Sequence, residues 1–223
     1  MKRSVIFDVD GTLLDTEKFY MEGWRRAGAI MGYPIPDEIL MKTRGVNKEV
    51  ALPLYQARFG EDFPFEEVRA HRIRFAEEII NAVAPEQLRK PGAMEALEPL
   101  RQKGFRLAVA SATGLELSRS HLSQAGLLDF FQAVITGDMV EKGKPAPDMF
   151  LLAARKLGCT PEECIVVGDS PADVFAASAA GMDVYLIPDQ IPANPDTRAK
   201  SRQVLNSLEQ LLSAMEEDGC VTN

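Results

Sequence analysis

The strongest constraint on the fold is an alternation of strand-like and helix-like stretches that runs from about residue 91 to residue 187. Short apolar runs such as "RLAVAS" (106–111) are separated by segments with helical spacing, most of which end at a glycine. Such alternation is typical of a parallel sheet whose two faces are covered by helices. With "SVIF" (4–7) added, it predicts an α/β protein built on a doubly wound parallel sheet. The predicted strands are 4–7, 106–111, 133–136, 164–170 and 184–187, and the predicted helices are 93–103, 116–125, 148–157 and 172–180.

Residues 17–86 differ from the rest of the chain because they contain almost no strand pattern. Their apolar residues recur instead at the spacing of one helix face, most clearly in 65–83. We therefore predict a helical domain over 17–86, inserted into a sheet domain formed by 1–16 and 87–223. The three prolines of 188–201 predict a loop there. The helices expected in the insert are 19–31, 37–42, 47–58 and 65–83.

Composition narrows the classes of partner. The net charge of −8 argues against nucleic acid or an anionic membrane surface as the main partner. No apolar run approaches the roughly 20 residues of a membrane-spanning helix. The three cysteines show no C-x-x-C spacing, which favours reduced thiols. We expect a cytoplasmic protein that binds a small ligand.

Three of the predicted strands end in polar residues of similar chemistry. Because the carboxyl ends of parallel strands meet at one edge of a sheet, near the place where ligands bind in such folds, we expect these residues to lie close together. A lysine in the Gly/Pro-rich stretch "KGKPAP" precedes the helix over 148–157 and is expected at the same edge. The residues are Asp8, Asp10, Thr12, Ser111, Ala112, Lys144, Asp169 and Asp173.

Carboxylates grouped in this way repel one another, at a cost of about 4 kcal/mol for a pair ~4 Å apart in an effective dielectric near 20. Either they take up protons or a cation lies among them, and hard oxygen ligands favour Mg²⁺. A cation together with Lys144 would form a positive pocket for a phosphoryl group, with donors at Thr12, Ser111 and Ala112. One carboxylate can then attack phosphorus, while a second protonates the leaving oxygen and later activates water. This division of roles explains two aspartates one residue apart, Asp8 and Asp10.

At these positions the sequence resembles the haloacid dehalogenase superfamily. The matching motifs are D-x-D-G-T at 8–12, Ser111 after an apolar strand, Lys144 in G-K-P-x-P, and G-D-S-x-x-D at 168–173. They occur in the family's order and extend over nearly the whole chain. The resemblance implies a Rossmann-like core with a helical cap inserted after the first strand, which corresponds to residues 17–86.

The resemblance also implies a role for each motif residue. Asp8 would be the nucleophile and Asp10 the general acid/base. Mg²⁺ would be held by the carboxylates of Asp8 and Asp169 and by the carbonyl of Asp10, with Asp173 assisting through water. The phosphoryl group would be held by Ser111 and Lys144, with Thr12 and Ala112 as further donors.

Within the superfamily, Asp10 indicates a phosphatase or phosphomutase, because dehalogenases lack this second acid. Length and cap type resemble the subfamily of phosphoglycolate phosphatases, sugar phosphatases and β-phosphoglucomutase. Two departures favour hydrolysis over mutase activity. Tyr20 stands where the mutase carries histidine, and the fourth motif is G-D-S-x-x-D, whereas the mutase-like pattern is E-D-S-x-x-G. In the cap, Tyr20, Arg44 and Lys48 are candidate contacts to substrate.

The sequence thus predicts a Mg²⁺-dependent phosphatase that acts on a small phosphorylated metabolite, such as a sugar phosphate. The nearest alternative is a β-phosphoglucomutase-like phosphomutase. A regulatory phosphoacceptor domain also combines aspartates, a hydroxyl, a lysine and Mg²⁺, but the first-strand Asp8 and the insert tell against it. A metabolite-binding protein without catalysis is the remaining alternative.

Overall fold

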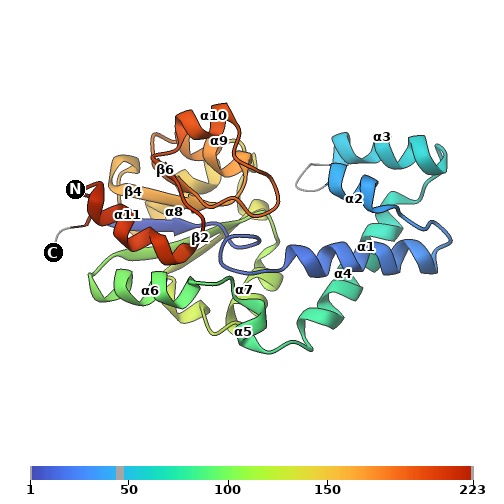
Figure 1. The fold of residues 1–223 in the computed structure, drawn as a ribbon, viewed down its shortest axis with the longest axis horizontal. Coiled ribbons are helices and arrows are strands. Elements are labelled where there is room, and N and C mark those ends of the chain that lie inside the picture. The colour runs from blue at the N-terminus through green and yellow to red at the C-terminus, as the bar shows by residue number, and fades with distance from the viewer. Residues whose placement is uncertain (1, 44–47, 222–223) are drawn as a thin grey trace. The chain divides into compact units, whose positions relative to one another are not determined.

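The sheet at the centre of the protein has six strands, all parallel, in the order β3-β2-β1-β4-β5-β6 (Figure 1). The computed structural model describes residues 2–43 and 48–221. This arrangement confirms the predicted α/β class. The strands are β1 (Ser4–Phe7), β2 (Arg106–Ser111), β3 (Ala133–Thr136), β4 (Cys164–Gly168), β5 (Asp183–Leu186) and β6 (Gln203–Val204).

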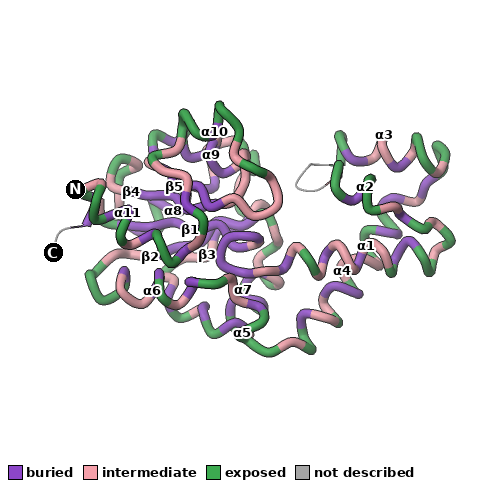
Figure 2. The backbone as a smooth tube through the Cα atoms, viewed as in Figure 1, coloured by how far each residue is buried: buried purple, intermediate pink, exposed green. Residues whose placement is uncertain are grey.

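The two central strands are buried along their whole length. Every residue of β1 and β4 is buried, and Figure 2 shows this burial continuing through the middle of the sheet. Val5 of β1 pairs with Leu107 on one side and with Ile165 on the other. Strands covered on both faces need apolar residues at successive positions, which explains the continuous apolar runs in the sequence.

Two layers of helices cover the sheet. Helices α8 and α9 pack on one face with α10 beside α9, while α6, α7 and α11 lie on the other (Figure 1). Right-handed crossovers produce this division, because the chain moves from β1 to β3 in one direction and returns to β4 to continue in the other. The helices are α5 (Pro85–Leu88), α6 (Ala93–Gln102), α7 (Leu115–Gln124), α8 (Asp148–Leu157), α9 (Pro171–Ala179), α10 (Pro195–Lys200) and α11 (Leu211–Glu217). The described residues also form 3-10 turns: η1 (Leu128–Phe130), η2 (Gly137–Met139), η3 (Pro161–Glu163) and η4 (Leu208–Gln210).

The prediction of a loop over 188–201 is wrong for its last part, because α10 occupies Pro195–Lys200. The Asn194 side chain accepts a hydrogen bond from the backbone N–H of Thr197 at 2.9 Å, and Pro195 stands at the first helical position. A proline at that position costs no helical hydrogen bond, so it starts a helix as readily as it marks a loop.

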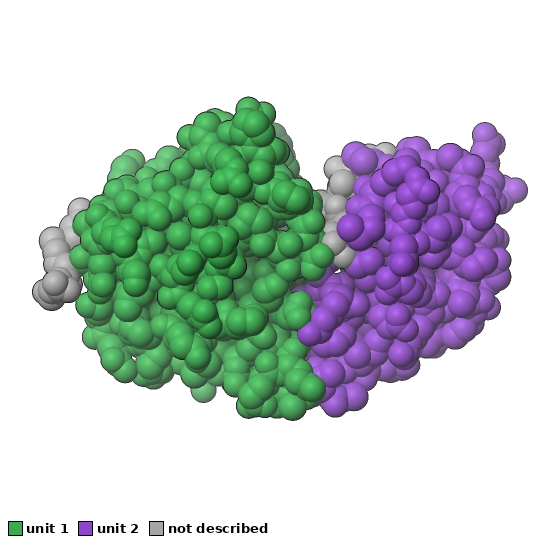
Figure 3. All heavy atoms as spheres, in the orientation of Figure 1, with its two compact units in different colours: residues 1–15, 84–223 green, residues 16–83 purple. Residues whose placement is uncertain are grey.

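The chain divides into two compact units, residues 1–15 with 84–223 and residues 16–83, which Figure 3 distinguishes by colour. The second unit contains α1 (Glu17–Ile30), α2 (Asp37–Lys42), α3 (Lys48–Phe59) and α4 (Phe65–Ile80). Its identification as a cap stays a prediction. None of the helices among the described residues is long and apolar enough to cross a membrane.

The two segments that lead into and out of the second unit run side by side within the first. The backbone N–H of Asp15 donates to the carbonyl of Leu88 at 2.9 Å, and the N–H of Lys90 donates to the carbonyl of Leu13 at 2.9 Å. An isolated antiparallel bridge between Leu14 and Arg89 joins the same segments. The ends of the insert are therefore neighbours on the sheet domain.

The second unit has a core of its own, centred on the fully buried ring of Tyr55. The ring stacks on Phe63 at 5.1 Å and on Trp24 at 5.2 Å between centroids, and the hydroxyl lies 3.2 Å from the Thr43 Oγ1. Such pairs stabilise a core beyond the area that they bury. The helices α1 and α4 approach closely at Gly23, where a Cβ atom would lie 2.5 Å from the carbonyl oxygen of Arg72.

We predict that Tyr55→Ala destabilises the second unit by about 3–5 kcal/mol, because it leaves a cavity among stacked rings. Trp24, the only tryptophan of the chain, reports on this unit. In Tyr55→Ala, the fluorescence of Trp24 during urea unfolding should show its transition at a lower urea concentration than in the wild type. Tyr55→Phe is the matched control, since it keeps the ring and loses only one hydrogen bond, worth about 1 kcal/mol. Equal urea midpoints for Tyr55→Ala and the wild type would contradict this description of the core.

Candidate active site

The loop that follows β1 turns back on itself directly after Asp8. The backbone N–H of Asp8 still pairs with Val167 at 2.8 Å, and then the N–H of Gly11 reaches the carbonyl of Leu14 at 2.8 Å. Gly11 has a φ of 93°, and a Cβ atom there would lie 2.6 Å from the Asp169 Oδ2. A residue with a side chain fits neither this conformation nor this space. Glycine therefore lets the β1 loop approach the end of β4.

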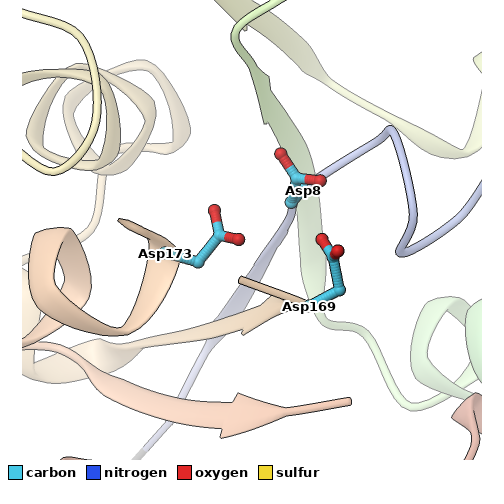
Figure 4. Close-up of side chains that lie close together, drawn as sticks. All are labelled: Asp8, Asp169 and Asp173. Atoms are coloured by element: carbon cyan, nitrogen blue, oxygen red, sulfur yellow. The ribbon is translucent and has the colours of Figure 1, made fainter. Parts of the chain in front are cut away.

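Three carboxylates meet at this point, from the ends of β1 and β4 and from the first turn of α9 (Figure 4). One oxygen from each of Asp8, Asp169 and Asp173 can be chosen so that all lie within 4.8 Å of one another. The Thr12 hydroxyl donates to the Asp169 Oδ1 at 3.2 Å and lies 3.5 Å from the Asp8 Oδ2. The site lies where the strand order reverses, between β1 and β4, as expected for a ligand site in this fold.

Burial and mutual repulsion shift the pKa values of this group. Burial raises the pKa of Asp8 to about 7, against the lowering effect of the Lys144 ammonium, and the charges of Asp173 and Asp10 add to the increase. Burial, Asp8 and Asp173 together raise the pKa of Asp169 well above its usual range. Buried oxygens that repel one another in this way are suited to a hard divalent cation such as Mg²⁺.

Lys144 supplies the positive charge of the site. Its ammonium forms a hydrogen-bonded ion pair with the Asp8 Oδ1, contacts the Asp173 Oδ1 at 2.7 Å, and donates to the carbonyl of Ala110 at 3.1 Å. The lysine side chain is only 7% exposed. Although burial alone lowers its pKa, Asp173 and Asp8 outweigh burial, and the pKa of Lys144 is raised. The ammonium therefore stays charged beside the candidate nucleophile.

Asp173 also caps the start of α9. It is the third residue of α9, and its Oδ2 accepts hydrogen bonds from the Ser170 N–H at 3.1 Å and the Ser170 hydroxyl at 2.6 Å. This capping box fixes the carboxylate, while its other oxygen contacts Lys144. Asp173 thus orients Lys144 in addition to lying near the candidate metal position.

Asp10 lies near the polar end of β2. Its Oδ2 accepts hydrogen bonds from the Ser111 hydroxyl at 3.1 Å and from the Thr113 hydroxyl at 2.8 Å. Ala112, the next residue after Ser111, is exposed. The structure therefore brings together the residues that the sequence predicts at this edge of the sheet. Ala112 is the exception, since no contact between it and the other residues is described. Thr113 also belongs to the site although it lies outside the four motifs, and its position two residues after Ser111 is the sequence signal that points to it.

Two of the three candidate contacts in the second unit, Tyr20 and Lys48, have partners within that unit. The guanidinium of Arg72 lies 4.5 Å from the centre of the buried Tyr20 ring. Lys48, the first residue of α3, is exposed and forms an ion pair with Glu66. Arg44 lies outside the described residues. The roles of Tyr20, Arg44 and Lys48 toward substrate stay predictions.

We predict that Asp169→Asn makes the metal-free protein more stable, because it removes one of the repelling buried charges. In EDTA the midpoint of thermal unfolding should rise by roughly 2–4 °C per kcal/mol gained. Added Mg²⁺ should raise the midpoint of the wild type and change that of Asp169→Asn little. Asp62→Asn is the control. Asp62 is an exposed acid of the helical unit, so this variant should respond to Mg²⁺ as the wild type does. An equal Mg²⁺ response in Asp169→Asn would contradict a metal site here.

Comparison with known proteins identifies the class. Residues 2–181 match the family model of the haloacid dehalogenase-like hydrolases. The chain belongs to this family, and the family is one of enzymes.

Individual relatives fit this assignment. The chain is 30% identical to a phosphorylated carbohydrates phosphatase of Thermotoga maritima over 94% of this chain and 99% of that protein. It is 26% identical to β-phosphoglucomutase of Bacillus subtilis over 81% of this chain and 80% of that protein. Among solved structures, a HAD family hydrolase of Deinococcus radiodurans with bound phosphate and sodium shares 28% identity and a TM-score of 0.79, covering 99% of this chain and 98% of that one. The relatives thus include both phosphatases and a phosphomutase.

Proposed function

We propose that this protein is a Mg²⁺-dependent phosphatase that hydrolyses a small phosphorylated metabolite, a sugar phosphate or similar phosphomonoester, through an aspartyl phosphate on Asp8. The observation that carries the proposal is the pair formed by Asp8 and Asp10. Asp8 lies against a buried ammonium, and Asp10 lies beside the Ser111 hydroxyl. The Thermotoga maritima relative, which is named for its action on phosphorylated carbohydrates, supports the substrate class.

In the first step a carboxylate oxygen of Asp8 attacks phosphorus, and the bond between phosphorus and the substrate oxygen breaks. Lys144 and the Ser111 hydroxyl donate to the phosphoryl oxygens, and Asp10 gives a proton to the leaving oxygen. Mg²⁺, held by Asp8, Asp169 and the Asp10 carbonyl with Asp173 close by, would supply positive charge to the phosphoryl group and lower the repulsion of the nucleophile.

In the second step Asp10, now a carboxylate, takes a proton from water. The water oxygen attacks phosphorus, the bond between phosphorus and the Asp8 oxygen breaks, and inorganic phosphate leaves. Asp10 keeps the proton that it takes from water, so the enzyme ends in its starting state. Closure of residues 17–86 over the substrate would exclude bulk water during these steps.

The second candidate function is a phosphomutase that uses the same aspartyl phosphate and returns the phosphoryl group to a sugar. The Bacillus subtilis β-phosphoglucomutase among the relatives favours it. Tyr20 in place of the mutase histidine and the G-D-S-x-x-D motif favour hydrolysis. A regulatory phosphoacceptor and a non-catalytic binding protein are disfavoured, because the family consists of enzymes.

The test is release of inorganic phosphate from sugar phosphates, phosphoglycolate and nucleoside monophosphates, with Mg²⁺ and with EDTA. We expect Mg²⁺-dependent release from at least one sugar phosphate. Asp8→Asn should abolish it, and Asp10→Asn should lower kcat by about 10²–10⁴, the usual contribution of a general acid/base. Glu116→Gln, at an exposed acid in the first turn of α7, is the control and should keep full activity.

Three outcomes would contradict the proposal. Conversion of β-glucose 1-phosphate to glucose 6-phosphate without free phosphate would establish the mutase instead. Phosphate release that Asp8→Asn retains would exclude the aspartyl phosphate. Release that is equal in EDTA and in Mg²⁺ would exclude the metal.

A further inference from the structure

Thr113 and Ser111 form a closed ring of hydrogen bonds with Asp10. The backbone N–H of Thr113 donates to the Ser111 Oγ at 3.0 Å. The Ser111 hydroxyl donates to the Asp10 Oδ2 at 3.1 Å, and the Thr113 hydroxyl donates to the same oxygen at 2.8 Å. Because the Ser111 oxygen already accepts from the Thr113 N–H, its own proton is directed toward Asp10. Thr113 therefore acts on Asp10 twice, directly and through Ser111.

The backbone of Thr113 is itself held in place. The hydroxyl of the buried Ser118, in the second turn of α7, donates to the Thr113 carbonyl at 3.0 Å. The backbone N–H of Ser118 donates to the carbonyl of Gly114 at 3.0 Å, so the loop after β2 is tied to the start of the helix. A hydroxyl fixed in this way keeps its direction, which is what the placement of a general acid requires.

We propose that Thr113 is a positioning residue for Asp10, an inference that rests on the proposed function. Its hydroxyl donates to the Oδ2 of Asp10 at 2.8 Å and so fixes the orientation of the carboxyl group that protonates the leaving oxygen.

The arrival of substrate makes Thr113 more important. A serine hydroxyl has one proton to donate, so Ser111 can serve either Asp10 or a phosphoryl oxygen, but not both in full. When the phosphoryl group takes the Ser111 hydroxyl, the Thr113 hydroxyl remains on Asp10. Thr113 thus keeps the acid in place at the moment when its other hydroxyl donor is withdrawn.

The test compares Thr113→Val, which removes the hydroxyl at nearly constant shape, with Thr113→Ser, which keeps it. Two substrates separate acid catalysis from other effects. The oxygen that leaves an alkyl phosphate such as a sugar phosphate needs a proton, whereas the p-nitrophenolate that leaves p-nitrophenyl phosphate is stable without one. We expect Thr113→Val to lower kcat/KM for the alkyl phosphate by about tenfold or more and for p-nitrophenyl phosphate by less than about twofold. Thr113→Ser should restore the alkyl rate to within about threefold of the wild type.

Equal losses with the two substrates would overturn the proposal, because they would indicate a role in phosphate binding or in folding. An unchanged alkyl rate in Thr113→Val, or a Thr113→Ser variant as slow as Thr113→Val, would overturn it as well. Failure of the proposed function is recognised separately, since the wild type would then release no phosphate or Asp8→Asn would match it.

A second measurement does not depend on turnover. In crystal structures of the wild type and of Thr113→Val, the carboxylate of Asp10 should move by about 1 Å or more, or occupy more than one rotamer, once the hydroxyl is removed. An Asp10 carboxylate that keeps its position and its contact with Ser111 in Thr113→Val would overturn the proposal whether or not the enzyme is active.

Discussion

The site depends on the contacts of the Lys144 ammonium with the residues around it. All three of its protons have acceptors, namely Asp8, Asp173 and the carbonyl of Ala110, which belong to three different segments of the sheet domain. Without this charge, buried carboxylates from β1, β4 and α9 would face one another, and no other lysine or arginine among residues 2–43 and 48–221 forms an ion pair with them. The lysine therefore allows acids to accumulate at the end of the sheet, and buried carboxylate oxygens of this kind suit a hard divalent cation.

The topology determines why these particular segments meet. The chain leaves β1 toward one edge of the sheet and returns to β4 on the other side, so the loops after these two strands diverge and leave space between them. Asp8 and Asp169 border that space, and Gly11 keeps it narrow because no side chain stands between its loop and Asp169. The positions of the two acids thus depend on the ends of β1 and β4 and on the absence of a side chain at Gly11.

Much of this arrangement follows from the sequence. Continuous apolar strands identify the sheet, and polar residues at their carboxyl ends identify Asp8, Ser111 and Asp169, because parallel strands bring such ends to one edge. The role of Thr113 does not follow, since it depends on how the loop after β2 folds back against α7. Helix α10 was missed for a related reason: Pro195 is read as a loop residue unless the cap formed by Asn194 is known. Sequence patterns identify elements and strand ends well, but they describe poorly the loops whose shape is fixed by hydrogen bonds to other segments.

The paired segments that join the two units have a consequence for how such a chain can change. Because residues 13–15 and 88–90 are hydrogen-bonded neighbours, the chain leaves the sheet domain for the helical unit and re-enters the sheet domain at adjacent points. A longer, shorter or wholly different insert could join the same two ends without altering the register of any strand. The insert can therefore diverge over evolutionary time, while the acids and the lysine at the strand ends stay fixed.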